Sequence, residues 1–383
     1  MAENMDQVLT VVFGGPSPEH DISILTGLQC ERVLLDAGYD VKTIYWSRVG
    51  GFHLVPNRLE ADDFLTGVPR KASELSIELG SKPGIYRQGS LRKHRVEVGT
   101  VINCCHGGPG EAGVLGSVFD LCGIPSTGGT AWAAMLGMDK LAFSGVMQAA
   151  GLPCLPRLLV TDSLENPPFR APYIVKPRMG GSSLGIQIAA DMATVHELVR
   201  TYPPLRAGAI VEPFLSPASD LNVAFRTRPN LEYSLIERPM RNSEDGFYDY
   251  RAKYLEGGGL EAAPRELPAN IPDTVRDALL NYTSTIVGHG AFAGVGRIDF
   301  LLHDESLYVN EINTIPGAMS FYLWPDDVQY RELLLGMVEE AKEKPGWPQG
   351  GDHAGTGEAL RVASGISQKL MQQRGGAQVA SRG

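Results

Sequence analysis

The stretch GVGRIDFLLHDESLYVNEINTIPGAMSFYLWP, Gly294–Pro325, contains the clearest structural signal in the sequence. Two apolar-rich runs, Val295–Leu302 and Ser306–Ile312, flank the turn-prone residues His303-Asp304-Glu305. Apolar runs around a short polar turn are typical of a β-hairpin. The sequence therefore predicts a hairpin that leads at once into a turn at Pro316-Gly317.

Three polar side chains are expected on one face of this hairpin. Side chains alternate along a strand, so Asp299 would lie nearly opposite Glu311, with Asn313 on the same face as Glu311. Opposed carboxylates repel each other and require a cation, and oxygen ligands of this kind suit Mg²⁺. Arg297 shares that face and could meet an anion beside the metal. The alternative is a surface hairpin whose acids are solvated.

The composition bounds the class of protein. A chain of 383 residues suggests two or three domains, and 43% hydrophobic with 20% charged residues is typical of a soluble globular protein. The net charge of −10 argues against a nucleic-acid partner. No apolar run reaches the roughly 18–20 residues of a membrane span. Five cysteines in no metal or disulfide spacing fit a reducing cytoplasm.

The first part of the chain predicts an open α/β unit. Strand Val8–Phe13 is followed by a glycine-rich turn and a helix from about Asp21 to Ala37. Strand Val98–Cys105 runs into the glycine-rich segment His106–Glu111, and Val114–Leu121 reads as a helix. Strands that alternate with helices indicate such a unit, and ligands lie at the carboxyl edge of its sheet.

Two positions at this edge have alternative interpretations. Glu19, at the entry of the first helix, could bind a substrate ammonium or could simply favour the first helical turn electrostatically. Cys105 beside His106 could be taken for a nucleophile pair, but adjacent strand residues point to opposite faces. We therefore expect no catalytic cysteine.

A basic region rich in glycine and serine follows. A helix from Met138 to Ala150 carries Lys140, and a strand at Pro172–Pro177 carries Lys176. The loop Arg178–Gly185 could wrap a phosphate with its amides and hydroxyls, while the two lysines neutralise the charge. In the next strand, Ala209–Leu215, the side chain and backbone of Glu212 could hydrogen-bond the edge of a base.

The last third of the chain contains one irregular aromatic segment. Phe247–Tyr254 shows neither strand nor helix period, and a long irregular loop in a compact domain is usually functional, so we expect a lid. Asp327–Glu343 predicts an amphipathic helix. Beyond Pro345 the chain is Gly-rich, with one more helical stretch near Glu358–Gln373.

These segments resemble, in order and spacing, those of the D-alanine–D-alanine ligases of the ATP-grasp superfamily. The likeness runs from Val8 to about Lys344. The matching motifs are Gly14-Gly15-x-Ser17-x-Glu19-His20, His106-Gly107-x-x-Gly110-Glu111-x-Gly113, Met138-Asp139-Lys140, Val175-Lys176-Pro177, Gly181-Ser182-Ser183-x-Gly185, Phe247-Tyr248-Asp249-Tyr250-x-Ala252-Lys253-Tyr254, Arg297-x-Asp299 and Glu311-x-Asn313-Thr314-x-Pro316-Gly317.

The resemblance implies an α/β chain with the three-domain ATP-grasp fold. The expected domains are an N-terminal substrate-binding domain (1–128), a central subdomain (129–212) and a C-terminal subdomain with the metal site and the lid (213–349). ATP would lie between the last two. The Gly-rich tail, 350–383, has no assignment. The resemblance also implies a homodimer, because relatives are commonly dimers.

The family roles carry over to matching positions of this sequence. The expected ATP-binding residues are Lys140, Lys176, Ser183, Lys253, Glu212, Phe214, Leu215 and, near the ribose, Asp220. Two Mg²⁺ ions, for which Mn²⁺ could substitute, would be held by Asp299, Glu311 and Asn313. Glu19 would meet the ammonium of the first amino acid, linked to Ser182 and Tyr254. His106 and Glu111 would line that pocket, Arg297 and the Gly317 amide would stabilise the oxyanion, and Tyr322 and Leu323 would meet the second substrate.

The implied chemistry joins two small amino acids. One carboxylate attacks the γ-phosphorus of ATP to form an acyl phosphate, and the amine of the second molecule then displaces phosphate to give an amide. The lid would keep water from the acyl phosphate. With D-alanine as both substrates, the product would be a dipeptide for peptidoglycan.

The sequence departs from the family pattern at three positions. Ala112 replaces an Asp, Gly116 replaces a Gln, and Tyr322 stands where the family has a small Ser that holds the second carboxylate. A phenol can donate the same hydrogen bond from further out. Either these changes are neutral, or the enzyme is an ATP-grasp ligase of specialised metabolism with another acceptor.

Two other classes of function are less well supported. A non-catalytic ATP-binding regulatory module should have lost the metal triad or the lysines, and all are present. A nucleotide-dependent dehydrogenase should carry Gly-x-Gly-x-x-Gly after the first strand, and it does not.

Overall fold

The computed structural model describes residues 8–89, 92–240 and 264–344, together with 357, 360–361 and 365–366. Met1–Lys344 forms one compact unit and Pro345–Gly383 a second, and the elements below belong to the first. The expected lid, including Lys253 and Tyr254, lies outside the described residues, as does most of the expected helix at Glu358–Gln373. Among the described residues, no helix is both long and apolar enough to cross a membrane.

The first sheet has seven strands in the order β6-β5-β4-β3-β2-β1-β7. Only β1 pairs in parallel, with β2 and β7, so the predicted α/β unit is extended on one side by antiparallel strands. The strands are β1 (Val8–Gly14), β2 (Asp40–Trp46), β3 (Phe52–Val55), β4 (Ser73–Glu78), β5 (Gly84–Gln88), β6 (Lys93–Val96) and β7 (Thr100–Asn103), and the helices of this part are α1 (His20–Asp36), η1 (Ala61–Phe64), α2 (Gly108–Glu111) and α3 (Val114–Leu121).

The central part begins with two helices, α4 (Ala131–Met138) and α5 (Lys140–Ala149). The sequence predicted one helix from Met138. The structure instead starts α5 at Lys140, because the Asp139 carboxylate caps it by accepting from the amides of Leu141 and Ala142, both at 3.1 Å. A sheet of order β10-β9-β11-β8 follows. Its elements are β8 (Leu158–Leu159), β9 (Tyr173–Pro177), β10 (Gln187–Ala189), α6 (Met192–Thr201), η2 (Pro203–Leu205) and β11 (Ala209–Pro213).

The predicted hairpin forms the edge of a third sheet, of order β13-β12-β16-β17. Asp299 pairs with Glu311 and Arg297 with Asn313, as side-chain alternation predicts, and a bulge follows Asp299. The elements of this part are β12 (Ser219–Arg226), β13 (Glu232–Tyr233), β14 (Arg238–Pro239), β15 (Arg265–Glu266), α8 (Asp273–Gly290), β16 (Val295–His303) and β17 (Ser306–Asn313).

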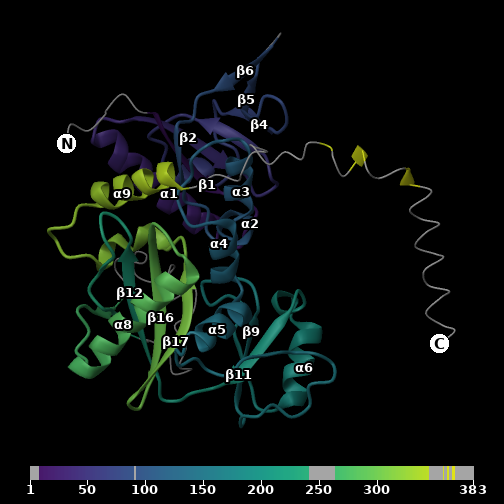
Figure 1. Cartoon of the computed structure of the whole chain (residues 1–383), viewed down its shortest axis with the longest axis vertical. Coiled ribbons are helices and arrows are strands. Elements are labelled where there is room, and N and C mark those ends of the chain that lie inside the picture. The colour runs from purple at the N-terminus through teal and green to yellow at the C-terminus, as the bar shows by residue number, and fades with distance from the viewer. Residues whose placement is uncertain are drawn as a thin grey trace. The chain divides into compact units, whose positions relative to one another are not determined.

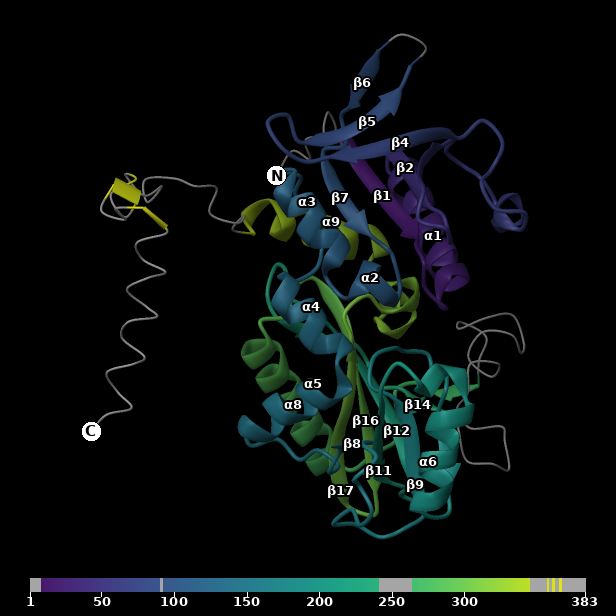
Figure 2. The ribbon, with the colours of Figure 1, turned by 90° about the vertical axis from the view of Figure 1, so that its right-hand side faces the viewer.

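The helix near the end of the unit, α9 (Tyr330–Glu343), returns to the first sheet. Figures 1 and 2 show it beside α1, and its buried face joins the same apolar cluster as β1. An ion pair between Lys344 Nζ and Asp120 Oδ1, 3.3 Å long, ties its end to α3. The core under the N-terminal sheet is therefore completed by residues from the other end of the unit.

A strained turn follows the hairpin. In η3 (Gly317–Leu323) the three consecutive residues Ala318, Met319 and Ser320 have φ of 49°, 48° and 51°. Left-handed backbone is unfavourable for residues that carry a Cβ. The amide of Ala318 donates to Thr26 Oγ1 at 3.0 Å, and Met319 and Ser320 are fully buried, so packing against α1 holds the turn. Such strain is concentrated at functional sites.

We predict that Ala318→Gly stabilises the protein. Glycine removes the left-handed penalty of about 1 kcal/mol, part of which the greater entropy of the unfolded chain offsets, so a net gain of roughly 0.5 kcal/mol is expected. Thermal or urea unfolding measures it. The matched control is Ala278→Gly inside helix α8, which should destabilise by about 1 kcal/mol. Destabilisation of equal size by both substitutions would contradict the strained turn.

Candidate active site

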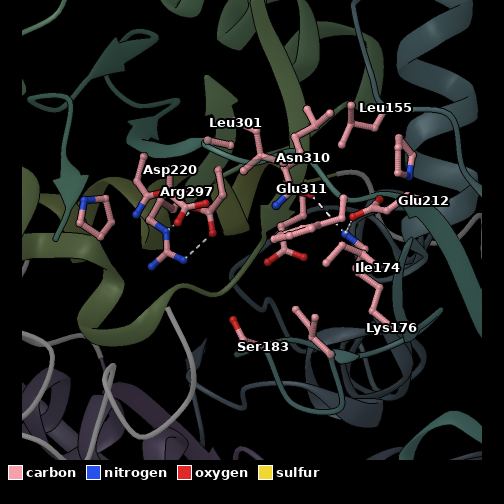
Figure 3. Close-up of a pocket in the computed structure, with 18 of the residues that line it drawn as sticks. Leu155, Ile174, Lys176, Ser183, Glu212, Asp220, Arg297, Leu301, Asn310 and Glu311 are labelled. Carbon is pink, nitrogen blue, oxygen red and sulfur yellow. Dashed lines mark hydrogen bonds and ion pairs between the residues drawn. The ribbon is translucent and has the colours of Figure 1, made fainter. Parts of the chain in front are cut away.

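A large pocket lies between the central sheet and the hairpin sheet (Figure 3). It encloses about 1080 Å³ of space, including its opening to solvent. Its lining brings together most of the residues predicted to bind ATP or metal. These are Lys176, Ser183, Glu212, Phe214, Leu215, Asp220, Asp299 and Glu311, with Arg297 and Tyr322 at the same wall.

One wall of this pocket is a buried network of charges. Glu212 Oε1 lies 2.7 Å from Lys176 Nζ, and Glu212 Oε2 lies 2.7 Å from Arg157 Nε. Asn310 Oδ1 accepts from Arg157 Nη2 at 2.7 Å and from Lys176 Nζ at 3.3 Å. Both carboxylate oxygens of Glu212 are thus engaged, so any contact of this segment with a base edge falls to its backbone rather than to the Glu212 side chain.

Burial and charge act in opposite directions in this network. Burial lowers the pKa of Lys176 to about 8, because desolvation and the charge of Arg157 outweigh the attraction of Glu212. Burial alone would raise the pKa of Glu212, but Lys176 and Arg157 outweigh it and hold that pKa below its usual value. The carboxylate is therefore firmly ionised, while the lysine is a cation that an anionic ligand would stabilise.

The glycine- and serine-rich loop faces the same space. Ser182 and Ser183 have φ of 52° and 57°, a left-handed conformation that turns the loop sharply. Ser183 lines the large pocket with Lys176, and it lines a smaller adjoining pocket with both Lys140 and Lys176. Lys140 Nζ donates to the Gly180 carbonyl and lies 3.1 Å from Glu311 Oε2. Two lysines and a tight loop at one spot are suited to a polyphosphate.

The predicted metal ligands sit together on the hairpin face, but their charges already have cationic partners. Arg297 forms a bidentate pair with Asp299, Nε to Oδ1 at 2.6 Å and Nη2 to Oδ2 at 2.8 Å. Asn313 Nδ2 donates to Asp299 Oδ2 at 3.2 Å. Lys140 pairs with Glu311. The opposed carboxylates therefore do not by themselves require a metal here, because Arg297 and Lys140 compensate their charges.

The donor set nevertheless fits Mg²⁺. Within the described ranges, no cluster of three or more His, Cys, Asp or Glu side chains could hold a metal ion. Mg²⁺ does not need such a cage, since it is commonly bound by one or two carboxylates together with water and substrate phosphates. Asp299 and Glu311 both line the large pocket together with Lys176, and Glu311 also lines the smaller adjoining pocket beside Lys140.

A second, smaller and more polar pocket adjoins the first. The residues predicted to bind the first amino acid or the oxyanion line it together, and they are Glu19, His106, Glu111, Ser182, Arg297 and Gly317. Its empty volume is about 530 Å³. Arg297 and Glu311 line both pockets, so the two spaces meet at these side chains.

The surroundings of Glu19, which stands at the N-cap of α1, favour the substrate-binding interpretation. Its side chain makes no capping hydrogen bond to α1, and instead accepts from the Ser182 hydroxyl of the glycine- and serine-rich loop. Glycines make room for it, because a Cβ at Gly107 would lie 2.4 Å from Glu19 Oε2 and one at Gly181 3.1 Å away. Glu19 is therefore a pocket carboxylate positioned to face a cation.

Glu111 joins the N-terminal part to the end of the hairpin. Its Oε1 accepts from the Thr314 amide at 3.0 Å, the Thr314 hydroxyl at 3.1 Å and the Ile315 amide at 3.1 Å, and its Oε2 from the Gly107 amide at 2.8 Å. Burial, and then the charge of Glu19, raise the pKa of Glu111 to about 7 despite these hydrogen bonds. A cation between the two carboxylates would relieve their repulsion.

His106 and Cys105 follow the same strand and differ in role. Burial lowers the pKa of His106 to about 4, so its ring is neutral at pH 7, and its Nε2 lies 2.8 Å from Thr26 Oγ1. Cys105 is fully buried, and burial raises the pKa of its thiol. A buried protonated thiol is a poor nucleophile, in agreement with the expectation of no catalytic cysteine.

The two residues predicted at the second substrate are separated. Tyr322 lines the large pocket, and its hydroxyl accepts from Arg297 Nη1 at 3.4 Å. Arg265 lies over its ring, 4.5 Å from the centroid, and pairs with Glu237 at 3.1 Å. Leu323 is instead fully buried in the core beside α9 and lines neither pocket, while its carbonyl accepts from the Leu235 amide.

Sequence reasoning did not identify three residues that hold this site. Arg157, Asn310 and Thr26 contact predicted site residues without belonging to the quoted motifs. Asn310 directly precedes Glu311 in the sequence, and that position was the one available signal. Arg157 and Thr26 reach the site through tertiary packing, which no local pattern reveals.

Two family models match the chain. One, described as D-ala D-ala ligase N-terminus, matches residues 8–129, and the other, D-ala D-ala ligase C-terminus, matches residues 147–335. The D-alanine–D-alanine ligase of Corynebacterium aurimucosum is 28% identical over 363 residues, covering 89% of this chain and 99% of the relative. That of Mycolicibacterium vanbaalenii is 31% identical over 364 residues, covering 87% and 96%.

Solved structures share the fold. The D-alanine–D-alanine ligase of Helicobacter pylori aligns with a TM-score of 0.68 at 23% identity, over 90% of this chain and all (100%) of the other. The D-Ala:D-Ser ligase VanG of Enterococcus faecalis aligns with a TM-score of 0.70 at 20% identity, over 88% and 99%. At these identities the likeness concerns the fold, which is ATP-grasp. The chain therefore belongs to the D-alanine–D-alanine ligase family, whose members are ATP-dependent amide-forming ligases.

Proposed function

We propose that this ligase joins two molecules of D-alanine, with ATP in the large pocket and the amino acids in the small one. The observation that carries the assignment is the shared wall. Arg297 and Glu311 line both pockets, so a phosphate in one and a carboxylate in the other would meet there. The matching family models and the relatives are named as D-alanine–D-alanine ligases. These names favour D-alanine over a different acceptor in a specialised pathway, and they favour an enzyme over a non-catalytic ATP-binding module.

In this proposal the first D-alanine is oriented by charge. Its ammonium lies against Glu19, which Ser182 holds, and its carboxylate points toward Arg297 and the phosphate-binding loop. Neutral His106 and hydrogen-bonded Glu111 close the wall behind it. The substrate carboxylate attacks the γ-phosphorus of ATP, ADP leaves, and an acyl phosphate remains.

The second step forms the amide. The amine of the second D-alanine attacks the acyl carbon, and Arg297 with the Gly317 amide offset the charge that develops on the oxygen. The phosphate group leaves. Lys140 and Lys176 compensate the phosphate charges in both steps, and Tyr322 stands beside Arg297 where the second carboxylate would lie. Lys253 and Tyr254, in the expected lid, belong to the same proposal.

We assign Asp299, Glu311 and Asn313 as the residues that would hold Mg²⁺. When bound, the metal would neutralise phosphate charge and so ease the approach of one anion to another. For that, Asp299 and Glu311 would exchange their present partners, Arg297 and Lys140, for the cation. Lys140 and Arg297 are then available to the substrates.

We further propose the division into an N-terminal domain (1–128), a central subdomain (129–212) and a C-terminal subdomain (213–349), and a cytoplasmic location. Three separate sheets, within residues 8–103, 158–213 and 219–313, support the division. Helix α9 qualifies it, because this helix follows the third sheet in sequence and packs on the first.

We also propose that the protein is a homodimer that associates through α3 and α4. Val114 and Leu121 on α3, and Trp132 and Met135 on α4, expose between 41% and 53% of their surface and so present apolar side chains on neighbouring helices. Sedimentation equilibrium is expected to give twice the chain mass, and Trp132→Glu should shift the protein toward monomer. A wild-type mass of one chain at micromolar concentration would rule the dimer out.

The first prediction of the assignment concerns turnover. With ATP, Mg²⁺ and D-alanine as the sole amino acid, we expect release of ADP and phosphate and formation of D-alanyl-D-alanine, identified by mass and chiral analysis. L-Alanine should give no product, because the methyl group would fall on the other side of the pocket. No ADP release with D-alanine, together with release for another amino-acid pair, would contradict the substrate assignment.

The matched variant for this assay is Glu311→Gln. It keeps the shape of the side chain and removes the charge that a metal requires, so turnover should fall about a hundredfold or more. The variant should still fold, because Glu311 is not part of the apolar core, with a lower melting temperature from the loss of its ion pair with Lys140. Full activity in this variant would refute the assigned metal site.

A second prediction concerns pH. Nucleotide phosphates stabilise the charged form of Lys176, so binding raises its pKa above the value of about 8 in the free protein. Affinity for ADP with Mg²⁺ should therefore be constant below pH 8 and decrease above it, by at most about tenfold per pH unit. Calorimetry between pH 7 and 9.5 measures this.

Lys176→Arg provides the control for the pH profile. Its guanidinium stays charged across this range, so the alkaline decrease should disappear even if the absolute affinity changes. An affinity that does not vary with pH in the wild type, or the same decrease in both proteins, would show that Lys176 does not meet the phosphates.

A further inference from the structure

A buried arginine behind the nucleotide pocket has no role in the chemistry described above. Arg157 lies between α5 and β8, and its side chain is 1% exposed. It is not among the residues that line either pocket, so it does not reach a ligand there. Burying a cation in a protein interior costs free energy unless the cation is fully paired. A buried arginine that contacts no ligand therefore needs a structural explanation.

The guanidinium bonds to three separate elements. Its Nε donates to Glu212 Oε2 on β11 at 2.7 Å, its Nη2 to Asn310 Oδ1 on β17 at 2.7 Å, and its Nη1 to the carbonyl of Lys140, the first residue of α5, at 3.2 Å. The planar fork of arginine can bond in three directions at fixed angles, which a lysine ammonium on a flexible stem cannot reproduce.

Each of these elements carries a residue of the proposed nucleotide site. Strand β11 leads into Phe214 and Leu215 at the base-binding end, β17 places Glu311 directly after Asn310, and α5 begins with Lys140 itself. Arg157 thus fixes the relative positions of the base-binding strand, the hairpin and one phosphate-binding lysine.

The same contacts determine where Lys176 lies. Its ammonium is bonded to Glu212 Oε1 and Asn310 Oδ1, the two side chains that Arg157 also holds. With Arg157 bonded to the other oxygen, the Glu212 carboxylate cannot rotate without breaking a buried ion pair. In Figure 3, Lys176 and Glu212 lie together on one side of the pocket, across from Arg297 and Asp220.

We propose that Arg157 is a positioning residue of the nucleotide site, acting through Glu212 and Asn310 on Lys176 and through the Lys140 backbone on α5. It would set the affinity for ATP without touching ATP. The inference rests on the proposed nucleotide site, and it extends that site by a residue outside the motifs shared with the family.

The test compares Arg157→Met and Arg157→Lys with the wild type. Arg157→Met leaves Glu212 and Asn310 without their partner, so KM for ATP should rise about tenfold or more, as is common when an outer residue that orients ligands is removed. KM for D-alanine should rise by much less than KM for ATP, because Arg157 does not line the small pocket and contacts it only through the Lys140 backbone. Arg157→Lys keeps the charge but not the three hydrogen bonds. Its KM for ATP should therefore lie between that of the wild type and that of Arg157→Met.

Arg226→Met is the matched control. Arg226 also forms an ion pair within a sheet, with Glu232 at 2.5 Å, although this pair is only partly buried, and neither residue lines the pockets. Both KM values should stay at the wild-type level in this variant. A loss of general stability would affect both substrates, so the ratio of the two KM values separates positioning from simple destabilisation.

Two outcomes would overturn the inference. One is a folded Arg157→Met protein whose KM for ATP equals that of the wild type. The other applies where Arg157→Met does not fold, and is an unchanged KM for ATP in Arg157→Lys. If the wild type turns over no ATP with D-alanine, the proposed function fails. Calorimetric titration with ADP and Mg²⁺ then tests the role of Arg157 separately. Weaker ADP binding in the Arg157 variants than in the wild type supports the positioning role, and equal binding refutes it.

Discussion

Two buried carboxylates that face one pocket, Glu19 and Glu111, constrain the rest of this structure. Each is held by groups distant in sequence, Glu19 by Ser182 and Glu111 by the backbone of Thr314 and Ile315. The hydrogen bonds that hold Glu111 also join the glycine-rich loop after β7 to the end of the hairpin. The start of η3, with its left-handed residues, is placed by the same contacts and by Thr26. The pocket therefore exists only when the N-terminal, central and hairpin segments are assembled.

The same constraint explains why the pocket favours a cation. Burial, and then repulsion by Glu19, raise the pKa of Glu111 to about 7. Near neutral pH, Glu111 is therefore protonated in part of the molecules. An ammonium group next to Glu19 removes the repulsion and lets both carboxylates stay charged, whereas a neutral ligand of the same shape would not. In the proposed function, charge compensation rather than apolar contact would therefore select the ammonium end of an amino acid.

An analogous balance holds in the nucleotide pocket. The residues proposed to bind phosphate and those proposed to bind metal are paired with each other, Lys140 with Glu311 and Arg297 with Asp299. A nucleotide that arrives with its cation would exchange these pairs for equivalent ones, anion to lysine and metal to carboxylate. The number of buried unpaired charges stays low in both states, which limits the desolvation cost of binding. Glu212, which pairs with both Arg157 and Lys176, takes no part in this exchange, and its two ion pairs are the most deeply buried among the described residues.

Local patterns in the sequence predicted much of this arrangement. Side-chain alternation was sufficient to place Asp299 opposite Glu311, and glycine and serine spacing identified the loop at Ser182 and Ser183. Alternation could not predict that Arg297 would pair with Asp299, since it specifies a face and not a rotamer. Weak patterning left the antiparallel strands between 50 and 97 undefined. The helices at Met192–Thr201 and Asp273–Gly290 were not identified, although Asp191 before the first and Asp273 at the start of the second are helix-start signals. The packing of α9 on the first sheet depends on tertiary contacts alone, which local sequence patterns do not reveal.

Tyr322 illustrates how such tertiary contacts alter the meaning of a substitution. In sequence it is a bulky residue at a position where the family has a small serine. In the structure its hydroxyl meets Arg297, its ring lies beneath Arg265, and it comes from a turn whose backbone is strained and buried. The left-handed turn and the long side chain together bring the phenol to the arginine that also contacts Asp299. Arg297, the proposed oxyanion donor, is thereby held from two sides, by Asp299 and by Tyr322. The tyrosine therefore helps to fix the arginine as well as lining the pocket. A change of residue type at one position is thus compatible with the chemistry of the family, because the surrounding contacts determine where its hydroxyl lies.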